Sequence, residues 1–142
     1  MVIGYGNSLR RDDGIGVLVA QRLSETLTAD TVTVVSCRQL MPELAEALAD
    51  VDIVVFIDAS DGSPPGKITI VPLPNDDRAE KGFTHHFSPS TLLALGERLH
   101  GHRPEAFLVS ICGQSFDLGE ELSPAVAAAL PQAIQEVHRL IG

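Results

Sequence analysis

The chain has 142 residues, of which 44% are hydrophobic and 4% aromatic, so residues 1–142 are expected to form one domain with an aliphatic core. It carries 19 Asp and Glu against 10 Lys and Arg, a formal net charge of −9 that disfavours nucleic acid as a partner. No apolar run approaches the roughly 20 residues of a membrane span, and no signal peptide is evident. We therefore expect a cytoplasmic protein with no membrane partner.

Strand and helix patterns alternate along the chain. Val2-Ile3 is a short strand, and the apolar residues from Ile15 to Leu27 follow the period of one helical face. Further strands are predicted at 31–37, 53–57, 67–71 and 106–112, and further helices from about residue 42, from Ser88-Pro89 and from Ser123-Pro124. Such alternation is typical of an α/β protein with a mainly parallel sheet between layers of helices.

The most informative stretch is Gly4 to Gly16, GYGNSLRRDDGIG, which joins the first strand to the first helix. A dinucleotide-binding loop is excluded, because Leu9 stands at the third glycine position and two acids would face the pyrophosphate. A structural interpretation makes Asp12 the N-cap of the helix and Asp13 a partner of the helix dipole. That interpretation suits Asp12, but it explains neither the second acid nor the surrounding glycines.

Acidic and imidazole side chains also occur where a parallel sheet collects functional groups, beyond the carboxyl ends of its strands. Asp12 and Asp13 follow the first strand, and Asp58 ends the apolar strand 53–57. His85 and His86 precede the helix that starts at Pro89. Two carboxylates and one imidazole would form an O,O,N metal site with open positions for a substrate.

The pattern G-x-G-N-x-L-x-x-D-D-G-x-G resembles the signature of the hydrogenase maturation peptidases, which trim the C-terminal tail of nickel-iron hydrogenase large subunits. The resemblance implies a three-layer α/β/α sandwich of the phosphorylase/hydrolase-like class. Its five-stranded, mostly parallel, twisted sheet would have the order 2-1-3-5-4, with the fourth strand, residues 67–71, antiparallel. It also implies that Asn7 orders the first turn.

The same resemblance assigns both the metal-binding and the catalytic role to Asp13, Asp58 and His86. His86 is chosen over His85 because the family histidine can stand three residues before a proline, as His86 stands before Pro89. The metal would be nickel carried by the substrate, with no permanent cofactor. The implied partner is the immature hydrogenase large subunit, and the chain is expected to act as a monomer.

Two places depart from the family pattern. After the second strand many members carry an acidic D-G-G turn, whereas this chain has Ser36-Cys37-Arg38-Gln39, and Gly113-Gln114-Ser115 lacks the proline that some members carry after strand 5. Both differences concern the choice of partner more than the activity. Two alternative functions fit the same residues: a metallohydrolase with its own zinc, and a hydrogenase assembly chaperone that does not cut.

Overall fold

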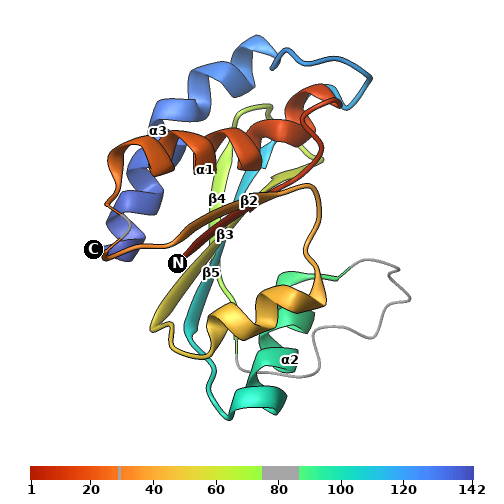
Figure 1. The fold of residues 1–142 in the computed structure, drawn as a ribbon. Helices are drawn as coiled ribbons and strands as arrows, with labels where there is room; N and C mark the ends of the chain where they lie inside the picture. The colour runs from red at the N-terminus through yellow and green to blue at the C-terminus, as the bar shows by residue number, and fades with distance from the viewer. Residues whose placement is uncertain (29, 75–86) are drawn as a thin grey trace.

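The computed structural model describes residues 1–28, 30–74 and 87–142, which form a five-stranded sheet with helices on both faces (Figure 1). The strands are β1 (Val2–Tyr5), β2 (Val34–Cys37), β3 (Ile53–Ser60), β4 (Ile68–Pro72) and β5 (Glu105–Cys112). Their order is β2-β1-β3-β5-β4, with β4 antiparallel to β5 and the other pairs parallel. The predicted three-layer α/β/α sandwich, strand order and antiparallel fourth strand are confirmed.

Among the described residues, three α-helices and two 3₁₀ helices accompany the strands. They are η1 (Arg11–Gly14), α1 (Ile15–Thr26), η2 (Pro42–Leu48), α2 (Pro89–His100) and α3 (Pro124–Ile141). The cap of α2 forms as predicted, since the Ser88 hydroxyl accepts a hydrogen bond of 3.1 Å from the Thr91 backbone N–H. No helix within the described ranges is long and apolar enough to cross a membrane.

The sheet is covered on both faces, and β3 lies at its centre. Residues Val54 to Ile57 are all fully buried. Val55 and Ile57 pack into a cluster with α1 and α3, while Val54 and Phe56 pack into a second cluster with η2 and α2. Because both faces of β3 are covered, its sequence is continuously apolar instead of alternating.

Asp58 lies inside a strand, which corrects the prediction that the strand ends there. β3 continues to Ser60, because Ala59 and Ser60 pair in register with Ile111 and Cys112 of β5. Asp58 is therefore held by the sheet and not by a loop.

Helix α1 packs unusually close to the sheet at its first turn. A Cβ atom on Gly16 would lie 2.3 Å from the Ile57 carbonyl oxygen and 2.9 Å from that of Tyr5. Only a residue without a side chain lets the helix approach β1 and β3 this closely. This close approach sets the position of η1 relative to Asp58.

We predict that Gly16→Ala lowers the free energy of unfolding by about 1–3 kcal/mol, because the added methyl group overlaps backbone that cannot move alone. Gly96→Ala in α2 is the matched control, since its Cβ atom would meet neighbours at an ordinary 3.6–3.7 Å. The control should be neutral or stabilising by up to about 1 kcal/mol, as alanine favours helix. Urea unfolding of both variants measures the difference, and equal stabilities would contradict the prediction.

Candidate active site

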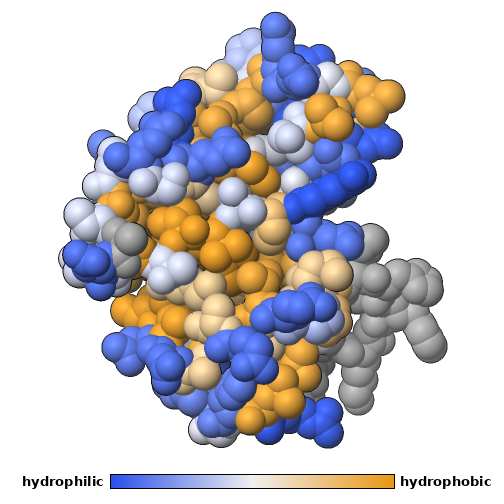
Figure 2. Space-filling view, in the orientation of Figure 1, coloured by the Kyte–Doolittle hydropathy of each residue, from blue (hydrophilic) through white to orange (hydrophobic). Residues whose placement is uncertain are grey.

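A cavity of about 440 Å³ opens at the carboxyl ends of β1 and β3, and both predicted acidic ligands line it. Asp13 reaches it from η1 and Asp58 from β3. Tyr5, Arg38 and Phe87 line the same cavity. In the space-filling view the molecule is hollowed on one side, and mostly hydrophilic residues border the hollow (Figure 2).

The turn after β1 holds the Asp13 carboxylate in place. The backbone N–H of Asn7 donates a hydrogen bond of 2.8 Å to Asp13 Oδ2, and the Asn7 side-chain oxygen accepts one of 3.0 Å from the Leu9 N–H. Gly6 has φ +144°, and a Cβ atom there would lie 2.0 Å from the Asp13 carbonyl oxygen. The expectation that Asn7 orders this turn is therefore confirmed.

Asp12 is not a helix cap, in contrast to the prediction. Its side chain is fully buried, and neither η1 nor α1 has a side-chain cap. Its carboxylate accepts hydrogen bonds from the backbone N–H groups of Gln114 (2.8 Å), Ser115 (2.9 Å) and Ser123 (2.7 Å), and from the Ser123 hydroxyl (2.7 Å). Asp12 thus joins the loop after β1 to the loop between β5 and α3.

The two neighbouring acids diverge because they lie on a 3₁₀ helix. Three residues make one turn of such a helix, so successive side chains point about 120° apart. Asp12 therefore points into the protein while Asp13 points into the cavity. Burial alone would raise the pKa of Asp12, but the hydrogen bonds from Ser123, Ser115 and Gln114 outweigh it and lower that pKa.

The second cavity carboxylate, Asp58, has the opposite electrostatic environment. Burial raises its pKa to about 6, and the charge of Asp13 adds to the increase. Hydrogen bonds from Tyr5 and from the Ala59 N–H (2.7 Å to Oδ1) oppose this increase without cancelling it. Burial and the Asp58 carboxylate also raise the pKa of Tyr5, so its hydroxyl stays protonated as a donor. Two carboxylates in one partly buried cavity suit a divalent cation, and a pKa near 6 suits proton transfer near neutral pH.

The third predicted ligand, His86, and its neighbour His85 lie outside the described residues. Phe87, which follows His86 directly, lines the cavity with Asp13 and Asp58. Within the part of the chain that is described, no three His, Cys, Asp or Glu side chains form a group able to hold a metal. Two of the three predicted ligands therefore line one cavity, and the third lies outside the described part of the chain.

No protein-family model matches the chain. The hydrogenase expression/formation protein HupD of Rhodobacter capsulatus is 32% identical over 151 aligned residues, which cover 98% of this chain and 69% of that relative. The hydrogenase 2 maturation protease of Escherichia coli is 28% identical, over 96% of this chain and 87% of its own length.

The chain belongs to the hydrogenase maturation proteases. Among solved structures it is similar to the [NiFe] hydrogenase maturation protease HycI of Thermococcus kodakarensis, with a TM-score of 0.81 and 26% identity. That similarity covers 99% of this chain and 90% of the other. As a member of this family, the chain is a peptidase.

Two residues that line this maturation protease's cavity, Tyr5 and Arg38, and the loop-joining role of Asp12 are absent from the predictions made from sequence. Tyr5 is the single tyrosine of the chain and stands between two glycines, a signal that could have been used. In the sequence Arg38 stands out only as part of a departure from the family turn, yet it lines the cavity. The contacts of Asp12 span 102 to 111 residues of sequence, so no local pattern could have indicated them.

We predict that Asp12→Asn lowers the free energy of unfolding by about 2–5 kcal/mol at pH 7, because an amide nitrogen would then face buried N–H donors. Asp117→Asn, at an exposed acid of the same loop, is the control and should change stability by less than about 0.5 kcal/mol. The lowered pKa of Asp12 means that its contribution is present above about pH 4 and is lost as the pH falls towards the native pKa. Urea unfolding from pH 7 to pH 3 should therefore show a difference between wild type and Asp12→Asn that shrinks with acid.

Asp58→Asn should have the opposite effect on stability. The native pKa of about 6 lies above the unfolded value of about 3.9, so the native state binds more protons and loses stability as the pH rises from about 4 to 6. The amide carries no charge and avoids that loss. We expect Asp58→Asn to be more stable than wild type by about 1–3 kcal/mol at pH 7.5, and to approach it near pH 4. A stability difference that does not vary between these pH values would count against the raised pKa.

Proposed function

We propose that this chain is the endopeptidase that removes the C-terminal extension of a nickel-iron hydrogenase large-subunit precursor after nickel insertion. The observation that carries the proposal is the shared cavity of Asp13 and Asp58 in a chain that belongs to the hydrogenase maturation proteases. We further propose that it acts as a monomer in the cytoplasm.

In this proposal the enzyme recognises nickel that the substrate brings with it. Asp13, Asp58 and His86 would complete the coordination of a nickel ion already bound by cysteines of the precursor. Neither carboxylate forms an ion pair with another described residue, so their combined negative charge is available to a divalent cation. The position of Phe87 on the cavity wall supports a contribution from the adjacent His86.

The chemistry of the described residues favours water as the nucleophile. Burial raises the pKa of Cys37, which disfavours the thiolate needed for attack. Cys112 is buried, and its sulfur lies 3.6 Å from the Ser60 hydroxyl. Two routes remain open: water can attack a carbonyl polarised by the metal, or a cavity carboxylate can take the proton of the attacking water.

The test is to incubate the chain with nickel-loaded and nickel-free precursor and to compare the precursor masses. We expect the nickel-loaded form alone to lose its tail. Asp13→Asn should lower the cleavage rate at least about 100-fold with unchanged circular dichroism and thermal midpoint, because the amide is a poor ligand and a poor base. The control is Asp52→Asn, which should cleave normally. Asp52 is an exposed acid just before the amino end of β3, whereas Asp58 lies near the carboxyl end of that strand.

The outcomes separate this proposal from its alternatives. Equal, chelator-sensitive cleavage of both precursors would favour a hydrolase with its own zinc. Binding of the precursor without any loss of mass would favour an assembly chaperone. Unimpaired cleavage by Asp13→Asn would refute the assignment of Asp13.

A further inference from the structure

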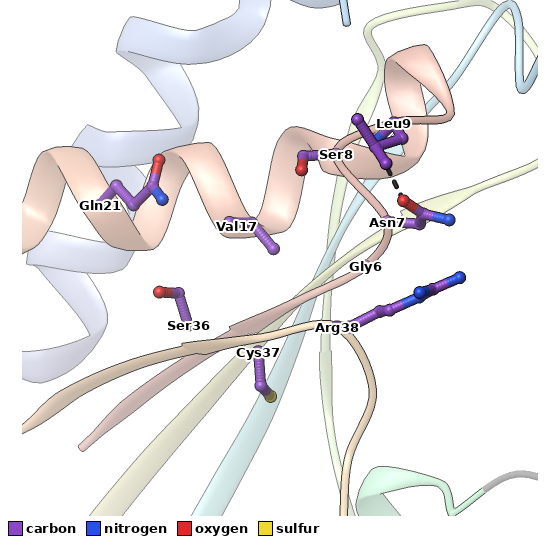
Figure 3. Close-up of a pocket in the computed structure, with 9 residues that line it drawn as sticks. All are labelled: Gly6, Asn7, Ser8, Leu9, Val17, Gln21, Ser36, Cys37 and Arg38. Carbon is purple, nitrogen blue, oxygen red and sulfur yellow. Dashed lines mark hydrogen bonds between the residues drawn. The ribbon is translucent and has the colours of Figure 1, made fainter. Parts of the chain in front are cut away.

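A second cavity, of about 350 Å³, adjoins the first between α1 and the end of β2 (Figure 3). Val17 and Gln21 of α1 line one side of it, and Ser36 faces them from β2. The two cavities share Gly6, Asn7 and Arg38 in their walls. A ligand lying in both would therefore cross the turn that holds Asp13, with Arg38 beside it.

We propose that this second cavity is a subsite for the peptide substrate, and that Arg38 binds a carboxylate group of that peptide at the junction of the two cavities. The inference rests on the proposed function, because it requires a peptide bound across Asp13 and Asp58. It goes further by assigning a substrate chemistry and a specificity residue.

Arg38 has the properties that such a role requires. It supplies the positive charge in the walls of the two cavities, whose other charged residues are Asp13 and Asp58. Within the described part of the chain its guanidinium forms no ion pair and donates no hydrogen bond. A guanidinium binds a carboxylate through two parallel hydrogen bonds, so this one is available for a ligand.

The negative charge of the protein explains why binding a substrate carboxylate at the junction of the two cavities requires a positively charged residue. The chain has a net charge of −9, and both acids of the first cavity repel a substrate carboxylate. A carboxylate placed on the Arg38 side of the turn gains a local attraction that offsets this repulsion. The arrangement therefore selects the direction in which an acidic peptide enters the cleft.

Asn7 offers a second donor at the same junction. Its side-chain oxygen accepts the Leu9 N–H, which identifies the atom facing that donor as oxygen. The amide nitrogen then points away, and among the described residues it donates no hydrogen bond. In Figure 3 this amide and the Arg38 side chain extend to the same side of the turn.

The test measures KM and kcat for nickel-loaded precursor with wild type, Arg38→Gln and Arg38→Lys. We expect Arg38→Gln to raise KM about 10- to 100-fold with kcat changed less than about threefold, because a charge-assisted contact is lost in binding. Arg38→Lys should be intermediate, since lysine keeps the charge and loses the paired donors. Arg22→Gln, at an exposed position of α1 outside both cavities, is the charge-matched control and should match wild type.

Changes in the substrate identify the source of the carboxylate. If the carboxylate belongs to an acidic side chain, changing that residue of the precursor to lysine should raise KM for the wild-type enzyme. The Arg38→Glu enzyme should then restore a low KM for this lysine-containing precursor. If it is the terminal carboxylate, extending the precursor tail by several glycines should raise KM for wild type and not for Arg38→Gln. An unchanged KM for Arg38→Gln with normal wild-type cleavage overturns this inference alone, whereas wild type that never cuts nickel-loaded precursor overturns the proposed function as well.

Discussion

The buried carboxylate of Asp12 is the contact on which the geometry of the cavity depends. Four hydrogen bonds of 2.7–2.9 Å tie it to Gln114, Ser115 and Ser123. Removing a carboxylate from water is costly, and these donors offset that cost, as the lowered pKa of Asp12 reflects. The 3₁₀ helix η1 is thereby fixed to the start of α3 and to the loop after β5. Because Asp13 is the next residue on that helix, its direction is fixed as well.

Asp12, Asp13 and Asp58 carry the same carboxyl group, but their different surroundings give them different roles. Asp12 receives buried donors and stabilises the fold. Asp13 and Asp58 share a cavity in which burial and mutual repulsion raise the pKa of Asp58 to about 6. A pair of carboxylates kept in such an environment costs stability, and proteins retain such strain where function uses it. That cost agrees with the proposed function, in which the two carboxylates bind a cation that the substrate supplies.

Arg38, the residue that follows β2, lies beside the cavity of the two acids and is the proposed determinant of substrate choice. The family resemblance marks the position after β2 as a place where many members carry an acidic turn, whereas this chain has Arg38. Arg38 lies where two cavities meet and has no partner among the described residues. Under the proposed role of Arg38, this difference in charge would change which peptides the cleft attracts, while Asp13 and Asp58 stay the same.

Hydrophobic periodicity, which is a local pattern, predicts the mainly parallel sheet and its helix layers, while the strand order that brings Asp13 and Asp58 to one cavity was implied by the family resemblance. The sequence misplaced the end of β3, because pairing with β5 extends that strand past Asp58. It also assigned Asp12 to a cap, since the nearest backbone donors are the expected partners of an acid at a helix start. Only the tertiary structure brings donors from more than 100 residues away to that carboxylate and places Arg38 between two cavities. Such contacts depend on how loops that are distant in sequence pack against each other, and no local sequence pattern predicts that packing.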